Sequence, residues 1–486
     1  MKLVLLLLHL SLAFAQKDPN FASGRSTIVH LFEWKWNDIA DECERFLQYQ
    51  GYGGVQVSPA SENLVIPDRP WWERYQPVSY IVNTRSGDEA AFLDMTRRCN
   101  AVGVRIYVDV VLNHMTERNG VGTAGSSADR DGRNYPAVPY TTDNFHGECN
   151  IDNWQDAAMV RDCELNHLVD LAQDQDSVRS KLIDYLNHLV DLGVAGYRVD
   201  AAKLMYPDDL GVIFSSVKNL NTDHGFPDGA RPFVYQEVID FNDDAVKKYE
   251  YIGIGNVLEF LAGVNLGNAF QGGNQLASLQ NWGTDWGLLE SSDAVVFIDN
   301  HDNQRTGGSQ ILTYKNPKPY KMAIAFLQAH PYGTTRVMSS YYFDNNDQGP
   351  PQDGNGNLIS PTINDDNTCG NGYACEHRWR EIYAMVGFRN TAEGTGIENW
   401  WSNGAQQIAF SRGNRGYVAF TIDGDLNQHL NTGLPAGTYC DVISGDLING
   451  ACTGKSITVG DDGYADIYIG IEEMDGVVAY HVNAKL

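Results

Sequence analysis

Short runs of apolar and β-branched residues alternate with helical patterns from Ser26 to about Ser340. Strands that are apolar on both faces are expected where helices cover a sheet. Eight strands with helices between them predict an α/β fold, a closed (β/α)8 TIM barrel. A doubly wound open sheet is the alternative, but no glycine-rich phosphate loop follows the first run. The eight runs are Ile28–Phe32, Gly54–Val57, Arg105–Leu112, Ala195–Val199, Phe233–Val238, Asn256–Phe260, Ala294–Ile298 and Thr335–Ser339.

Two of the intervening helices carry clear local signals. Ser86 and Glu89 have the spacing of a capping box, and Gly103 is expected to stop the helix that follows. A second helix shows an apolar stripe that ends at Gly193. Its members are Val178, Leu182, Tyr185, Leu186 and Leu189.

Two regions break the barrel rhythm. Residues 113–175, rich in Gly, Asp, Asn and Tyr, are too many for a loop and predict a small irregular domain inserted after the third strand. Beyond about Thr391, short alternating runs split by Gly and Asp predict an antiparallel β-sandwich. We expect a barrel of residues 16–112 and 176–394, an insertion of 113–175 and a sandwich of 395–486. The sandwich runs are Gln407–Arg412, Tyr417–Ile422, Tyr439–Ile443, Ser456–Val459, Tyr464–Ile469 and Val477–Val482.

The first fifteen residues have the charged start, apolar core and small-residue end of a secretory signal, and predict cleavage before Gln16. A membrane anchor is the alternative, but the apolar run is too short to span a bilayer.

The composition, 43% hydrophobic and 20% charged, is that of a globular protein with a net charge of −27. That charge disfavours nucleic acid and membrane surfaces as partners, whereas a neutral polymer such as a glycan stays compatible.

Eight cysteines in a chain with a secretory signal suggest disulfides. Many pairings are possible, but local spacing favours three short loops and leaves a fourth pair. A zinc site is the alternative, and no paired C-x-x-C supports it. The expected pairs are Cys149 with Cys163, Cys369 with Cys375, Cys440 with Cys452, and Cys43 with Cys99.

Acids stand where predicted strands end. Asp200 follows one run, Glu237 lies at the end of the next, and Asp302 follows the run that ends at Ile298. The carboxyl ends of barrel strands meet at one mouth, where TIM barrels hold their active sites. A single acid would more often be a surface carboxylate or a cap. Three acids at matching strand ends favour a shared site.

The motifs around these acids are recognisable. Asp109–His114, Gly196–Lys203 and Phe297–Asp302, with Glu237 between them, closely resemble the signature segments of the α-amylases. The match runs essentially from residue 16 to the end, and the local sequence is similar to the animal, especially insect, digestive enzymes. The resemblance implies a barrel, an inserted second domain and a C-terminal sandwich. It also implies secretion into a digestive lumen and endo-hydrolysis of α-1,4-glucosidic bonds in starch and glycogen.

The resemblance assigns roles to the acids. Asp200 is expected to be the nucleophile, Glu237 the general acid/base and Asp302 the residue that stabilises the distorted sugar. A protonated and an ionised carboxyl group about 5–5.5 Å apart cleave with retention through a covalent glycosyl-enzyme. Neighbouring acids raise the cost of ionising Glu237, which helps it keep its proton. Sugar contacts are expected from Trp71, Trp72, Tyr75, Gln76, His114, Lys203 and His301.

Each of these sugar contacts has a plainer interpretation. A lone histidine more often has a structural role, and aromatic residues more often belong to the core. Lys203 would serve equally as a solvated lysine at a helix start. The aromatic pair Trp71-Trp72 lies outside any periodic stripe, which favours a sugar-stacking face.

The resemblance also implies two ions. Structural calcium is expected from the Asn113 and Asp170 side chains and the Arg161 and Leu204 carbonyls, because calcium prefers hard oxygen ligands. Leu204 replaces the family's usual histidine. Chloride is expected at Arg198, Asn300 and Arg336, where an anion would screen two arginines and restore the proton of the catalytic acid. As alternatives, the calcium residues would be turn or cap residues, and the arginines would pair with the acids.

One further departure is the short segment 304–309, where vertebrate relatives carry a longer glycine-rich loop, and it suggests a more open cleft. The expected partners are starch, glycogen, malto-oligosaccharides and proteinaceous amylase inhibitors, with the protein a monomer. A transglycosylase using the same acids is one alternative function. A non-catalytic glycan-binding or transporter-accessory relative is another, and the retained acids disfavour it.

Overall fold

The computed structural model describes residues 16–486, so the predicted signal segment, residues 1–15, lies outside the described residues. Within the described part, eight parallel strands close into a barrel, and each coincides with a predicted run. The predicted (β/α)8 barrel is therefore confirmed. Its strands are β1 (Ser26–Leu31), β2 (Tyr52–Val57), β6 (Arg105–Val111), β9 (Gly196–Asp200), β10 (Phe233–Gln236), β11 (Asn256–Glu259), β12 (Ala294–Val296) and β13 (Thr334–Ser339).

The order of strands around the barrel is β1-β13-β12-β11-β10-β9-β6-β2. β1 thus lies between β2 and β13, and β9 and β10 lie across the barrel from it. The strands are buried along almost their whole length, which explains their unbroken apolar sequence. At Gly196 a Cβ would lie 2.0 Å from the carbonyl oxygen of Phe233, so β9 meets β10 at a place that only glycine fits.

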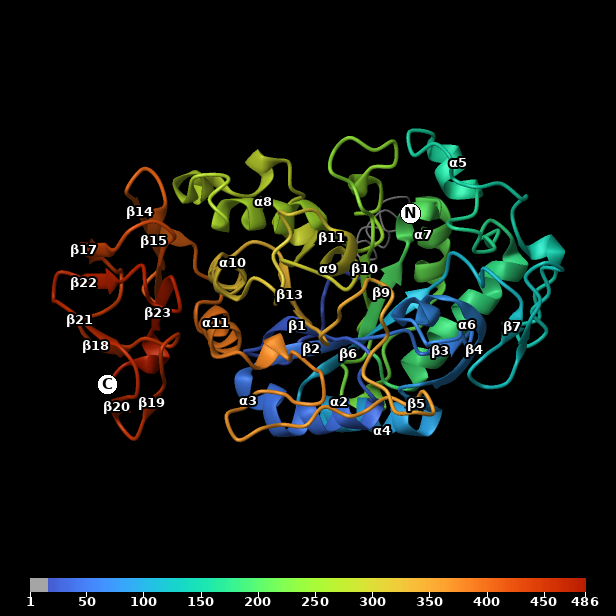
Figure 1. Cartoon of the computed structure of the whole chain (residues 1–486), viewed down its shortest axis with the longest axis horizontal. Coiled ribbons are helices and arrows are strands. Elements are labelled where there is room, and N and C mark those ends of the chain that lie inside the picture. Colours follow the sequence, from blue (N-terminus) through green and yellow to red (C-terminus); the bar gives the residue numbers. More distant parts are fainter. Residues whose placement is uncertain (1–15) are drawn as a thin grey trace, which may run out of the picture.

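Helices cover the outside of the barrel (Figure 1). The stripe predicted after residue 175 is the buried face of α6. The capping box predicted at Ser86 and Glu89 is wrong, because Asp88 caps the helix by accepting a hydrogen bond from the Ala91 amide. Ser86 is instead buried, and its hydroxyl accepts from Arg74. The covering helices are α2 (Trp36–Glu42), α3 (Gln48–Gln50), α4 (Glu89–Ala101), α6 (Asp176–Asp191), α7 (Pro207–Ser216), α8 (Phe260–Phe270), α10 (Pro317–Ala329) and α11 (Arg380–Thr391).

Residues 113–175 form few regular elements: β7 (Gly120–Val121), β8 (Ser127–Ala128) and α5 (Ala157–Asp162). This segment lies at the end of the molecule away from the C-terminal strands (Figure 1). Its buried tyrosine Tyr140 packs edge-on against Tyr80, which follows β2 in the chain. The insertion therefore packs against β4 (Pro77–Thr84), a strand of the small sheet that lies outside the closed barrel.

The C-terminal part is all-β and antiparallel, as predicted. One sheet has the order β14-β15-β16-β23, and β17 and β18 pair with β22 and β21. Side chains of both groups, such as Tyr417 and Ile467, share one core. α10 and α11 lie between these strands and the barrel (Figure 1). The strands are β14 (Ile397–Ser402), β15 (Gln407–Arg412), β16 (Gly416–Thr421), β17 (Leu426–Asn431), β18 (Gly437–Cys440), β19 (Leu447–Ile448), β20 (Ala451–Cys452), β21 (Ser456–Val459), β22 (Tyr464–Ile469) and β23 (Val477–His481).

Four disulfides join the same cysteines that the spacing favoured: Cys43–Cys99, Cys149–Cys163, Cys369–Cys375 and Cys440–Cys452.

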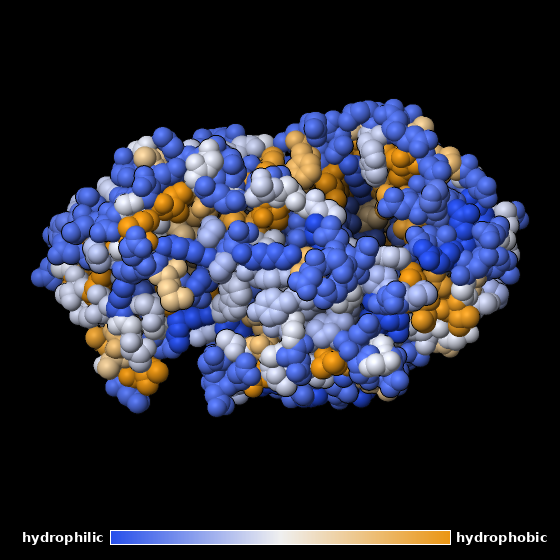
Figure 2. All heavy atoms as spheres, viewed as in Figure 1, coloured by the Kyte–Doolittle hydropathy of each residue, from blue (hydrophilic) through white to orange (hydrophobic). Residues whose placement is uncertain are grey.

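On the face shown in Figure 2, hydrophilic residues predominate and hydrophobic ones lie in small separate groups. From residue 16 onward, the helices are all too short or too polar to cross a bilayer.

Candidate active site

One buried arginine gathers three acids at the carboxyl ends of the barrel strands. Arg198 of β9 donates through Nη1 to Asp109 Oδ1 at 2.7 Å and to Asp200 Oδ1 at 2.5 Å. Its Nη2 lies 2.6 Å from Glu237 Oε1, at an angle that makes no hydrogen bond. Asp200 and Glu237 therefore face the same guanidinium and lie at the mouth together.

The residue after Asp200 fixes the position of Glu237. Ala201 adopts a left-handed conformation, with φ 48° and ψ 32°, which is unusual for a residue with a Cβ. In this conformation its amide donates to Glu237 Oε2 at 2.9 Å. Such strain persists where the surrounding structure holds it, and it often occurs at functional sites. Here the hydrogen bond from Ala201 to Glu237 links the residues that directly follow β9 and β10.

Burial and charge set the protonation of the two carboxyl groups. Burial raises the pKa of both Asp200 and Glu237, and the negative charge of Asp200 raises the pKa of Glu237 further. Arg198 opposes both shifts, but only Asp200 accepts a hydrogen bond from it. The Ala201 amide and Arg336 also lower the pKa of Glu237, so these contacts favour an ionised Asp200 through its direct bond from Arg198.

Asp302 completes the ring of acids from the segment after β12. Its Oδ2 lies 3.2 Å from His301 Nε2. Burial in the cleft and the charge of Glu237 raise the pKa of Asp302, although 38% of its side chain stays open to water, which limits the shift. His301 stacks on Tyr75 with ring centroids 5.2 Å apart and meets Trp71 edge-on at 5.4 Å. Aromatic residues thus line the mouth beside Asp302.

The residues of the predicted chloride set have buried donors without partners among the described residues, and Arg198 lies close enough to Arg336 to lower its pKa beyond the effect of burial. Arg198, Arg336 and Asn300 are almost wholly buried. Arg198 Nε, Arg336 Nε and Nη2, and Asn300 Nδ2 have no hydrogen-bond partner within the described chain. Buried donors without partners are costly. Four such donors on the three residues of the set fit the chemistry of an anion site.

The predicted calcium residues lie where the insertion meets the barrel. Asn113 Nδ2 donates to Asp170 Oδ1 at 3.0 Å, and the Asn113 Oδ1 oxygen is buried without a partner. Tyr251 fixes the other half of the set: it donates to the carbonyls of Lys203 and Met205, which flank Leu204, and accepts from Arg161. An orphaned amide oxygen beside a carboxylate fits a hard cation.

The other predicted sugar-binding residues are held by their own contacts. His114 Nε2 lies 2.9 Å from the Tyr75 carbonyl, and Gln76 accepts from the Glu117 amide. Lys203 donates to the Ile239 carbonyl and to Asp244 at 2.9 Å. A cavity of about 310 Å³ opens there, lined by Trp154, Leu165, Ala201, Lys203, Leu204, Glu237, Ile239 and Asp244.

Comparison with known proteins agrees with this geometry. The family model described as "Alpha amylase, catalytic domain" matches residues 68–256, and "Alpha amylase, C-terminal all-beta domain" matches residues 400–483. An α-amylase of Tenebrio molitor is 74% identical over 97% of this chain and 100% of its own length. One of Tribolium castaneum is 71% identical over 100% of both chains. The chain belongs to the α-amylase family.

A solved structure of an α-amylase gives the same fold. It is a glutamate-to-glutamine variant of α-amylase I from Eisenia fetida in complex with maltohexaose, with a TM-score of 0.91 and 44% identity. The similarity covers 95% of this chain and 98% of that one. Together these relatives make the chain an α-amylase enzyme.

Several residues of this α-amylase site were not predicted as members of it. Asp109 bridges Arg198 and Tyr75, whose hydroxyl donates to Asp109 Oδ2 at 3.0 Å. His30 and Gln56 are buried in β1 and β2 beside the two arginines, and Gln56 accepts from Arg336 at 2.9 Å. In the sequence, each of these residues is a polar residue inside an apolar strand. Such a residue indicates that its side chain has a polar partner, but the sequence does not identify that partner.

Proposed function

We propose that this α-amylase is a secreted digestive enzyme that hydrolyses internal α-1,4-glucosidic bonds of starch and glycogen with retention. The observation that carries the proposal is the shared contact of Asp200 and Glu237 with Arg198. It supports a pair of carboxyl groups in opposite protonation states on the two sides of one bond.

In the first step the Glu237 carboxyl proton passes to the glycosidic oxygen. An Asp200 carboxylate oxygen attacks the anomeric carbon as the bond to that oxygen breaks, which leaves a glycosyl ester. In the second step Glu237, now ionised, takes a proton from water. The water oxygen attacks the same carbon and releases Asp200. Two inversions give net retention, and Asp302 with His301 holds the distorted sugar.

We include calcium in the proposal, held by the Asn113 and Asp170 side chains and the Arg161 and Leu204 carbonyls. Members of the family generally bind calcium, and the unpartnered Asn113 Oδ1 favours it here. When bound, the ion supplies positive charge to an oxygen-rich seam between insertion and barrel. We keep the division into a barrel, an insertion of 113–175 and a sandwich of 395–486 as part of this proposal.

Chloride is the second ion of the proposal, with Arg198, Asn300 and Arg336 as its ligands. The two arginines lower the pKa of Glu237. When bound, chloride supplies a negative charge that offsets them. Arg198, Asn300 and Arg336 would hold the anion, and Glu237 would then keep its proton to higher pH.

The test is hydrolysis of soluble starch, followed by the release of reducing ends and by the anomeric form of the first products. We expect Glu237→Gln to lower the rate by about 10³-fold or more, because it removes both proton transfers. Glu472→Gln, an exposed glutamate of the C-terminal part, is the matched control and should keep full activity. Equal rates for both variants, or first products of the β anomer, would contradict the mechanism.

A further inference from the structure

The segment that follows Asp302 is anchored by two buried side chains. It begins with α9 (Asn303–Thr306), a helix of only four residues. A helix this short is not stable by itself, so its orientation depends on the side chains that tie it to its surroundings. Gln304 is one tie, because it donates to Asp299 Oδ2 at 2.6 Å. Arg305, with 8% of its surface exposed, is the other, and the proposed mechanism does not use it.

The guanidinium of Arg305 is enclosed by an aromatic cage of four rings. A cation within about 6 Å of a ring centroid is attracted to the ring face, more strongly where water is excluded. The rings follow β1, β2 and β13 in the chain, so the cage joins these strand ends to the segment after β12. The distances from Arg305 Cζ to the ring centroids are 4.2 Å for Phe343, 5.0 Å for Trp71, 5.4 Å for Tyr341 and 5.6 Å for Phe32.

The same guanidinium is bonded to the backbone of His301. Arg305 Nη1 donates to the His301 carbonyl oxygen, and Nη2 donates to the Tyr341 hydroxyl at 2.9 Å. The His301 ring stacks on Tyr75 with centroids 5.2 Å apart and on Phe32 with centroids 5.0 Å apart. Phe32 in turn stacks on Tyr341 at 5.8 Å. Arg305 therefore holds the His301 backbone directly and its ring through Phe32.

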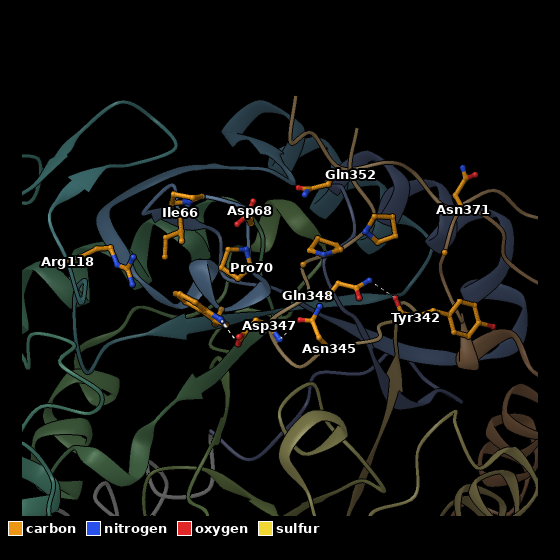
Figure 3. A pocket seen from close by; sticks show the side chains of 16 residues that line it. Ile66, Asp68, Pro70, Arg118, Tyr342, Asn345, Asp347, Gln348, Gln352 and Asn371 are labelled. Atoms are coloured by element: carbon orange, nitrogen blue, oxygen red, sulfur yellow. Dashed lines mark hydrogen bonds between the residues drawn. The ribbon is translucent and has the colours of Figure 1, made fainter. Parts of the chain in front are cut away.

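The cage walls are themselves held in place. The Tyr341 hydroxyl donates to the Gln348 carbonyl at 2.7 Å, and the Gln348 side chain donates to the Tyr342 carbonyl at 3.3 Å (Figure 3). Trp71 Nε1, from the loop after β2, donates to the Asn346 carbonyl at 2.8 Å. Walls fixed in this way leave the enclosed cation few other positions, and little ordering of the cage is needed when a substrate binds.

His301 is important to the proposed mechanism because its Nε2 lies 3.2 Å from Asp302 Oδ2, where both residues would hold the distorted sugar. We propose that Arg305 is a positioning residue, which keeps His301 in the orientation that this contact requires. The proposal rests on the proposed function, because it concerns the same reaction. Misplacing a group by about 1 Å from outside the reacting centre can cost about 10²-fold in rate. Loss of Arg305 should therefore slow bond cleavage only while His301 is present to be positioned.

The experiment measures kcat and KM for maltoheptaose at a temperature where circular dichroism shows each variant folded. Arg305→Met removes the charge and the donors, whereas Arg305→Lys keeps the charge without the fork of donors. We expect Arg305→Met to lower kcat by about 10²-fold with KM changed by less than about threefold, and Arg305→Lys to recover about tenfold of that loss. Lys315→Met is the matched control and should match wild type, because Lys315 is an exposed cation 3.9 Å from the centroid of the same Phe343 ring.

A double-mutant cycle tests whether Arg305 acts through His301. Residues that act as one unit show losses that do not add. In a His301→Ala background, Arg305→Met should lower kcat by less than about a further twofold. If Arg305→Met does not fold, Arg305→Lys takes its place in the cycle with the same criterion. Losses that multiply, or a folded Arg305→Met enzyme with wild-type kcat, would each overturn the positioning role. Wild-type enzyme that releases no reducing ends from maltoheptaose would instead overturn the proposed function, so the two failures are distinguishable.

Discussion

Arginines at the two ends of the barrel are used in opposite ways. At the mouth, Arg198 and Arg336 are buried with donors that have no partner among residues 16–486. At the other end, Arg412 of β15 donates to the carbonyls of Ala329, Ala392 and Thr395. Arg389 likewise donates to His330 and Gly333, just before β13 begins. The pair at the mouth has donors without partners in the described part of the chain, whereas the other pair bonds backbone carbonyls at the joint between β15 and the barrel.

The difference is instructive because burial alone does not distinguish the two ends. Burial lowers the pKa of Arg412 to about 10 and also lowers the pKa of Arg336. What separates them is the partner. Backbone carbonyls saturate the arginine at the joint, whereas Arg198 at the mouth faces three titratable carboxyl groups. A change at the mouth should therefore alter chemistry, and a change at the joint should alter only stability.

The largest effect is expected from Arg198→Met. It leaves Asp109, Asp200 and Glu237 buried without their cation, so their pKa values rise and the nucleophile is protonated near neutral pH. We expect kcat/KM on starch to fall by about 10³-fold or more and the free energy of unfolding to fall by about 3–5 kcal/mol. Steady-state kinetics and denaturant unfolding measure the two. Wild-type activity would remove Arg198 from the mechanism.

Arg412→Met, the same substitution at the joint, should affect stability alone. It removes the donor to the carbonyls of buried Ala329 and half-buried Thr395, whereas the Ala392 carbonyl keeps its bonds from Thr395, and we expect a loss of about 2–4 kcal/mol in unfolding free energy. The folded variant should keep the wild-type kcat/KM at low temperature. If kcat/KM fell as far as in Arg198→Met, the proposed contrast between the two ends would not hold.

Arg336→Gln should give the smallest effect, a shift in pH dependence. Arg336 lowers the pKa of Glu237, so its removal raises that pKa. A general acid loses activity as pH rises through its pKa, and the alkaline limb should therefore move up by about one pH unit without chloride. Added chloride should shift the limb in wild type only. Rate profiles with chloride and with a non-binding anion test this, and a variant that still requires chloride would contradict the anion site.

The barrel could be predicted from sequence because each buried strand is an apolar run with its own stop signal. The acids could be predicted because they follow those strands. The roles of Asp109 and Gln56 could not, since a polar residue inside a strand acquires its meaning only from side chains on other strands. The prediction of the helix cap was wrong for a local reason. Ser86 and Asp88 are both residue types that cap helices, but the Ser86 hydroxyl accepts a hydrogen bond from Arg74, so Asp88 is the cap.

The left-handed turn at Ala201 has one more consequence. Its amide hydrogen-bonds the carboxyl group of Glu237, the proposed general acid, before any glucan arrives. The entropy of ordering that side chain is therefore lost once, when the polypeptide folds, and not again in every turnover. Under the proposed mechanism, an acid held in this way is already oriented for proton transfer, so positioning of the sugar and not movement of the acid should set the rate of bond cleavage.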